Sequence, residues 1–190
     1  EVLDLAAVFA DGMEGREVKV NGAIMSVRNM GDIAFVILRK RDGVLQTVYE
    51  KGMTDADFTE LREETFVEVS GVLRKEERAP RGMELRLKSV RILSKPEEPM
   101  PIAVSKWKMS ASLEAKLDMR SLTLRNLRER ARFRIQEGIA RAFREYLHGE
   151  GFTEIHSPKI GAKGAEGGAN VFKLDYFHRP AVLAQSPQFY

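Results

Sequence analysis

Hydrophobic and polar residues alternate in several short segments of the first hundred residues, with the two-residue period of β-strands that have one buried face. Segment 66–74 is the clearest example, because apolar residues and one glycine occupy every second position from Val67 to Leu73. Segment 33–38 differs, since its six residues are all apolar, which predicts a barrel strand covered on both sides. The five predicted strands are residues 17–21, 33–38, 44–49, 66–74 and 84–93.

Segment 54–64 separates the third and fourth predicted strands and is predicted to be a helix, with Thr54 as its N-terminal cap and Leu61 facing inward. The order of three strands, one helix and two strands is that of the OB-fold, a five-stranded barrel. Barrels of this kind present one face and its loops to oligonucleotides or oligosaccharides. The pattern therefore predicts a binding barrel in the first half of the chain.

Three prolines between Pro96 and Pro101 remove backbone donors and favour an extended chain, so a domain boundary is predicted there. We expect a barrel domain at residues 1–100, a linker or hinge at 101–120 and the start of a second domain at 121–190. The second domain opens with apolar residues at every fourth position, which predicts a long amphipathic helix. That row consists of Leu127, Ala131, Ile135, Ile139, Phe143 and Leu147.

The predicted helix runs over residues 125–148, and Gly149 is predicted to end it in a left-handed cap. Its apolar row has two interpretations from the pattern alone. The row can face a core within the chain, or it can face another molecule.

Composition narrows the class of protein only slightly. The chain has 190 residues, of which 43% are hydrophobic and 31% are charged, as in ordinary globular domains. Cysteine is absent, which excludes disulfides and cysteine metal sites and favours a reducing compartment. The formal net charge of +3 permits a polyanionic partner without requiring one. No signal-like segment or apolar run of membrane-spanning length is visible, so we expect a cytoplasmic protein without a membrane partner.

Three motifs in the second half carry a family resemblance. A long helix, a turn at Gly151 and a predicted strand ending in Ser157-Pro158 resemble motif 1 of the class II aminoacyl-tRNA synthetases. The sequences Ala-Glu-Gly-Gly-Ala-Asn-Val-Phe at 165–172 and Ala-Gln-Ser-Pro-Gln-Phe-Tyr at 184–190 resemble a loop and a strand of the aspartyl and asparaginyl enzymes. The archaeal and eukaryotic type of aspartyl-tRNA synthetase is the more similar one, and it also carries an N-terminal OB-fold that reads the anticodon.

The resemblance implies an α+β protein, in which a five-stranded OB-fold barrel precedes the beginning of an antiparallel-sheet catalytic domain. It also implies an aspartate-tRNA ligase, which activates L-aspartate with ATP and Mg²⁺ and transfers it to the tRNA for aspartate. Whether the tRNA for asparagine is also a substrate stays open. Motifs 2 and 3, the ATP-binding groups and the Mg²⁺-binding carboxylates are expected beyond Tyr190. No catalytic residue is therefore expected in this chain, and the 190 residues alone are expected to be inactive.

The resemblance implies that Arg28, Phe35, Gln46 and Glu84 contact the anticodon, with its central uridine among the bases they address. The residue types suit this role, since an aromatic ring stacks on a splayed base and an amide reads a base edge with a donor and an acceptor. A carboxylate accepts from base amino or imino groups, and an arginine stacks or contacts phosphate. Phe35 as a core residue and Gln46 as a plain surface residue remain the alternatives.

Binding of the amino acid is assigned by the same resemblance to Glu166, Ser186 and Gln188. Glu166 lies in a glycine-rich loop that would close over the substrate and meet its ammonium group, whereas the plain alternative is a flexible surface turn. Gln188 would line the amino-acid pocket. No metal site is predicted, because His156 and His178 are 22 positions apart and lack ligand-spaced partners.

A homodimer is implied through motif 1, with Ile135, Ile139, Phe143 and Pro158 at the interface. Two other functions stay open at this stage. One is an asparaginyl-tRNA synthetase, which shares the barrel, motif 1 and the glycine-rich loop. The other is a tRNA-binding synthetase paralogue without catalytic activity.

Overall fold

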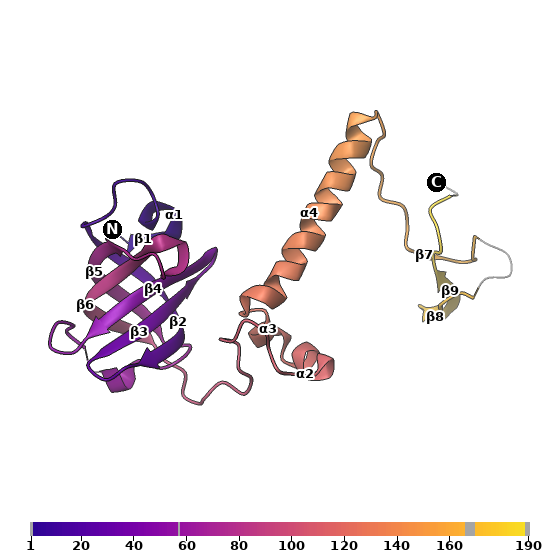
Figure 1. Cartoon of the computed structure of the whole chain (residues 1–190). Helices are drawn as coiled ribbons and strands as arrows, with labels where there is room; N and C mark the ends of the chain where they lie inside the picture. The colour runs from indigo at the N-terminus through magenta and orange to yellow at the C-terminus, as the bar shows by residue number, and fades with distance from the viewer. Residues whose placement is uncertain (1, 57, 166–169, 189–190) are drawn as a thin grey trace. The chain divides into compact units, whose positions relative to one another are not determined.

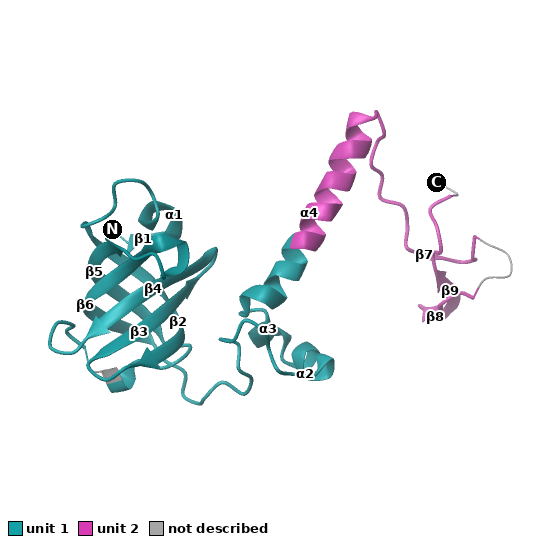
Figure 2. Cartoon of the chain, viewed as in Figure 1, with its two compact units in different colours: residues 1–134 teal, residues 135–190 magenta. Residues whose placement is uncertain are grey.

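The structure of the chain is a computed structural model that describes residues 2–56, 58–165 and 170–188 (Figure 1). The chain divides into two compact units, Glu1–Arg134 and Ile135–Tyr190, and the boundary falls inside one long helix (Figure 2). We describe each unit by itself.

The first unit contains a closed barrel, as the strand pattern predicted (Figure 1). Its strands follow the order β1-β2-β3-β4-β6-β5, and β5 pairs back with β2 to close the sheet. The β4–β6 pairing is parallel, whereas the other pairings among the five long strands are antiparallel. The strands are β1 (Val2–Leu3), β2 (Glu17–Asn29), β3 (Ile33–Lys40), β4 (Gly43–Glu50), β5 (Phe66–Lys75) and β6 (Met83–Ser94).

One apolar cluster fills the barrel, and alternating positions of every long strand contribute to it. A short helix, α1 (Leu5–Val8), adds Leu5 and Val8 to this core, and the Asp4 side chain caps it by accepting from the Ala7 amide at 2.8 Å. The short 3₁₀ turn η2 (Pro80–Gly82) precedes β6.

The prediction that segment 33–38 is covered on both sides is wrong. Ala34, Val36 and Leu38 are buried in the core, whereas Phe35 and Ile37 are only partly buried. The alternation follows from the barrel, which has a single core, so the outer face of β3 has no second layer packed on it. An outward-facing aromatic residue is therefore left partly open to solvent.

The helix predicted over residues 54–64 does not form, and a single 3₁₀ turn, η1 (Phe58–Glu60), occupies its middle. Thr54 caps no helix: its buried Oγ1 accepts from the Glu50 amide and donates to the Leu87 carbonyl, each at 3.1 Å. The Asp55 amide also donates to the Lys88 carbonyl at 2.7 Å. These bonds tie the segment to the barrel backbone, and they replace the bonds that a helix would make. Leu61 is buried in the core as predicted.

Residues 101–120, predicted as a linker or hinge, contain ordered structure. Helix α2 (Leu113–Asp118) begins at Ser112, whose hydroxyl accepts from the Ala115 amide at 3.1 Å, and α3 (Arg120–Thr123) follows. A small apolar cluster of Ile102, Val104 and Met109 is separate from the barrel core.

Helix α4 (Leu127–Gly149) is the long predicted helix. Asn126 organises its start, because Oδ1 accepts from the Arg128 and Glu129 amides at 3.0 and 3.1 Å. The left-handed residue at its end is Gly151, at φ 84°, and not Gly149. The Phe152 amide donates to the Leu147 carbonyl and the Gly151 amide to the His148 carbonyl, each at 3.0 Å. This pair of bonds is a Schellman motif.

The second unit ends in a small antiparallel sheet of order β7-β9-β8. Its strands are β7 (Ile160–Gly161), β8 (Lys173–Tyr176) and β9 (Arg179–Leu183), and the left-handed pair Phe177 and His178 turns the β8–β9 hairpin. The strand predicted after Gly151 does not form, since residues 152–158 have no pairing partner in the part of the chain that the structure describes. The strand predicted over 184–190 is also wrong for residues 184–188, because β9 ends before them.

Candidate nucleic-acid interface

Strand register brings the four predicted anticodon residues onto one outer face of the barrel. Arg28 on β2 lies opposite Phe35 on β3, and Gln46 on β4 lies opposite both Ile37 on β3 and Glu84 on β6. Residues that are opposite in register, or two apart along a strand, point to the same side of a sheet. Phe35 therefore lies on the side away from the core and is not a core phenylalanine.

Glu84 is the buried centre of this face, with 2% of its surface exposed. Gln46 Nε2 donates to Glu84 Oε2 at 2.9 Å, and Arg86 Nε donates to Glu84 Oε1 at 2.8 Å. Arg86 also pairs with Glu50, the last residue of β4. Both oxygens of the buried carboxylate are thus bonded, as a buried charge requires.

Arg86 was not among the predicted site residues. It lies two positions after Glu84 on β6, so the strand period alone would have placed it on the same face. Burial on its own would lower the pKa of the Arg86 guanidinium, but the hydrogen bond to Glu50 and the charges of Glu84 and Glu50 raise the pKa above its ordinary value. Arg86 therefore remains a fixed cation beside Gln46.

This geometry fixes which way the Gln46 amide points. An ionised carboxylate only accepts hydrogen bonds, so the atom facing Glu84 must be the amide nitrogen. One Gln46 N–H is used in this bond, which leaves the second N–H and Oε1 for another partner. Beside it, Phe35 offers a ring face and Arg28 an exposed guanidinium. Near Gln46, the cations Arg28 and Arg86 are accompanied by the anions Glu50 and Glu84, so this part of the face is not a purely cationic surface for phosphate.

The predicted amino-acid-binding residues are placed only in part. Glu166 lies outside the described residues. Ser186 and Gln188 follow the end of β9, with Gln188 exposed. The Ser186 hydroxyl oxygen is buried and has no hydrogen-bond partner in the described part of the chain. A buried hydroxyl without a partner is uncommon in folded proteins.

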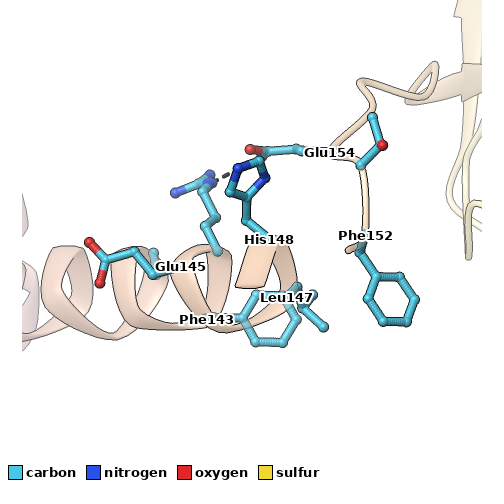
Figure 3. Close-up of a pocket in the computed structure, with 9 residues that line it drawn as sticks. Phe143, Glu145, Leu147, His148, Phe152 and Glu154 are labelled. Atoms are coloured by element: carbon cyan, nitrogen blue, oxygen red, sulfur yellow. Dashed lines mark hydrogen bonds and ion pairs between the residues drawn. The ribbon is translucent and has the colours of Figure 1, made fainter. Parts of the chain in front are cut away.

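The predicted dimer residues form an uncovered apolar surface. Ile135, Ile139 and Phe143 of α4 are 63%, 66% and 64% exposed, and Pro158 is exposed in the unpaired segment. A groove of about 540 Å³ lies where the end of α4 meets the following segment, and Figure 3 shows the residues that line it. Phe143, Leu147 and Phe152 line it, and Arg144 Nε bonds Glu154 Oε1 at 2.9 Å across it.

Among the described residues, no group of three or more histidine, cysteine, aspartate or glutamate side chains is arranged to hold a metal ion. In the same part of the chain, no helix is long and apolar enough to cross a membrane.

Comparison with known families accounts for both parts of the fold. Residues 18–93 match the family of OB-fold nucleic acid binding domains, and residues 112–190 match the class II tRNA synthetases of the D, K and N group. The barrel and the segment that begins with α2 thus place the chain in the family of class II tRNA synthetases.

Within that class, the chain is homologous to aspartate-tRNA(Asp/Asn) ligases. It is 42% identical to the ligase of Deinococcus radiodurans, over 93% of this chain and 39% of the relative, and 38% identical to that of Archaeoglobus fulgidus, over 94% and 42%. The asparaginyl-tRNA synthetase of Pyrococcus horikoshii, solved with asparaginyl-adenylate, has the same fold, with a TM-score of 0.81 and 30% identity over 100% of this chain and 44% of that one. The chain spans about two fifths of the length of the curated relatives it matches.

Proposed function

We propose that this chain is part of an aspartate-tRNA ligase, which uses ATP to activate L-aspartate and transfers the aspartyl group to tRNA. The observation that carries the proposal is the outer face of the barrel, where Gln46 lies opposite Glu84 and Phe35 lies two positions along β3 from Ile37, which is opposite Gln46. The names of the homologous ligases supply the amino acid.

The barrel reads the anticodon through its outer face. Phe35 stacks on a splayed base, which contributes about 1–3 kcal/mol per base in comparable proteins. Gln46 offers one N–H and one carbonyl oxygen after its bond to Glu84, and this donor and acceptor pair complements the N3–H and carbonyl edge of uracil. The central anticodon uridine is therefore the base we assign to Gln46.

Both the tRNA for aspartate and the tRNA for asparagine are proposed substrates. The homologous ligases carry both in their names. The anticodons GUC and GUU share their first two bases, so a face that reads the central uridine accepts both. The base at the third position would have to be read elsewhere for the two tRNAs to be distinguished.

ATP and Mg²⁺ are the remaining reactants of the proposed reaction. The described residues hold no cluster of carboxylates that fits Mg²⁺. We assign ATP and Mg²⁺ binding to the part of the relatives' length that this chain does not span. A translation enzyme of this kind is expected to work in the cytoplasm.

For the amino acid we propose that Glu166 meets the substrate ammonium group, with Ser186 and Gln188 beside it. The partnerless Ser186 hydroxyl supports a role in binding, because a substrate or a further segment of the enzyme would satisfy it.

A homodimer is proposed through α4 and the segment that follows it. The support is the exposed apolar surface of Ile135, Ile139 and Phe143, because contiguous apolar patches of this kind mark protein–protein interfaces. Residues 152–158 pair with no strand among the described residues, and a second copy of the same segment would supply one through a two-fold axis.

An asparaginyl-tRNA synthetase is the second candidate, because the Pyrococcus horikoshii enzyme shares the fold at 30% identity. ATP–pyrophosphate exchange by the full-length protein distinguishes the two. Exchange stimulated by L-aspartate and not by L-asparagine is expected. Stimulation by L-asparagine alone would indicate an asparaginyl-tRNA synthetase. No exchange with either amino acid would indicate a paralogue that only binds tRNA.

A further inference from the structure

Glu64 makes the most heavily bonded charge cluster of the first unit. Its carboxylate receives both terminal nitrogens of Arg39, at 2.5 and 2.9 Å, and Arg125 Nη1 at 2.6 Å. The Glu64 side chain is 4% exposed, and that of Arg39 is 11% exposed. A carboxylate held by a bidentate arginine and a second arginine has a fixed position and orientation.

The two arginines come from different parts of the unit. Arg39 is on β3, on the same side of that strand as Phe35, whereas Arg125 lies between α3 and α4, two positions before α4 begins. Glu64 thereby joins the barrel to the segment that leads into α4, across 61 positions of sequence.

Burial alone would raise the pKa of the Glu64 carboxyl, but the hydrogen bonds and charges of Arg39 and Arg125 outweigh it and hold the pKa below its ordinary value. The carboxylate is therefore charged at neutral pH, and both arginines keep their partner.

The backbone of Glu64 is strained, which points to a constrained position. Its φ of 66° is in the left-handed region, which side chains with a Cβ rarely adopt. Flanking bonds enforce this conformation: the Glu64 amide donates to the Ile24 carbonyl at 2.7 Å, and the Ile24 amide donates to the Thr65 carbonyl at 2.8 Å. Strain of this kind persists only where the surroundings over-determine it.

Among the described residues, no buried apolar cluster spans this junction. A groove of about 710 Å³ lies between the barrel edge at Gly22 and Ser94 and the segment around Ser121 and Leu124. The barrel core and the small cluster of Ile102, Val104 and Met109 are separate. Alignment of the segment on the barrel therefore depends on directional polar contacts.

We propose that Glu64 is a positioning residue of the aminoacylation reaction: through Arg125 it fixes the start of α4 against the barrel, so that a tRNA bound by its anticodon is held in one orientation for charging. This inference rests on the proposed function. It requires that loss of the Glu64–Arg125 pair affects charging of whole tRNA and leaves each binding step intact.

Arg125→Gln in the full-length protein is the direct test. It removes the Glu64–Arg125 ion pair and leaves the Arg39–Glu64 pair of the barrel in place. We expect kcat for tRNA charging to fall by about tenfold, since small misplacement of a reacting group costs that much or more. ATP–pyrophosphate exchange and affinity for an anticodon stem-loop should each stay within roughly twofold of wild type, because both depend on one domain alone.

Arg128→Gln is the matched control, since it removes the same charge three positions later without contacting Glu64. Arg125→Lys should recover part of the charging rate. Equal charging by Arg125→Gln and Arg128→Gln would overturn the proposal, as would a parallel loss of exchange, stem-loop binding and charging. Failure of the wild-type protein to charge tRNA with either amino acid is a different result, because it would remove the proposed function itself.

Discussion

Glu84 is the single residue on which the proposed anticodon face depends most, because its buried carboxylate orients both Gln46 and Arg86. Replacement by glutamine keeps the shape and removes the charge. Arg86 then loses its buried anion, and the Gln46 amide is free to turn over. Such a change alters recognition more than it alters the barrel.

We predict that Glu84→Gln weakens binding of an anticodon stem-loop by about tenfold and lowers the free energy of unfolding by about 1–3 kcal/mol. Fluorescence anisotropy and urea unfolding measure the two effects. Glu14→Gln, at an exposed carboxylate paired with Lys75, is the control and should change neither. Unchanged binding by the Glu84 variant would remove Glu84 from the recognition face.

Glu64 should make the free energy of unfolding depend on pH in the acidic range. Its folded-state pKa is below the ordinary value of 4.5, so its contribution is complete above that pH and is lost as the pH falls through the lower, folded-state pKa. Glu64→Gln should therefore be less stable than wild type near neutral pH and lose less stability on acidification. Urea unfolding at a series of pH values from about 6 to about 3 measures this. If the unfolding free energies of the two proteins fell in parallel with pH, Glu64 would not be the source of this pH dependence.

At the scale of elements, the sequence predicted what local periodicity encodes. The alternation in β5 and the four-residue row of α4 each depend on residues within the same element, so strands and helix were recovered. The failures depend on distant partners. Thr54 bonds the Leu87 carbonyl instead of starting a helix, and residues 152–158 have no strand beside them within residues 2–56, 58–165 and 170–188. Neither partner is visible in a local pattern.

The end of α4 offers a matched pair of glycines. Gly151 is left-handed, whereas Gly149 is the last helical residue. Gly151→Ala should therefore destabilise the protein by about 1 kcal/mol, and Gly149→Ala should be neutral or stabilise it by up to about 1 kcal/mol. Thermal unfolding of the two variants compares them directly. If Gly149→Ala were instead the less stable of the two variants, Gly149 would be the left-handed cap.

At the scale of the whole molecule, the sequence supplied candidate site residues but not the contacts between them. Motif resemblance supplied Phe35, Gln46 and Glu84, and the strand register then placed them on one face. Arg86 and Glu64 were missed, since their roles follow from contacts between strands or between segments far apart in sequence. A single sequence carries no direct signal for such pairs.

Assembly of the full-length enzyme should depend on the apolar surface of α4. Ile139→Asp places a charge in that surface, and we predict that it weakens the dimer by about 100-fold or more. Analytical ultracentrifugation across a concentration series measures this. Arg141→Ala, at a residue with exposed ion pairs to Glu137 and Glu145, is the control and should leave the dimer intact. A wild-type protein that sediments as a monomer would refute the proposed interface.

Titration of the chain with labelled anticodon stem-loops at fixed salt tests the central claim most directly, because phosphate contacts alone make affinity salt-dependent but not sequence-dependent. The loops carry GUC, GUU and a scrambled triplet, and Phe35→Ala is compared with Leu93→Ala, an exposed apolar residue of β6. We predict that wild type binds GUC and GUU alike and both more tightly than the scrambled loop. Phe35→Ala should lose about 1–3 kcal/mol of this binding, and Leu93→Ala should lose none. Equal affinity for all three loops, unaffected by Phe35→Ala, would contradict anticodon reading by this face.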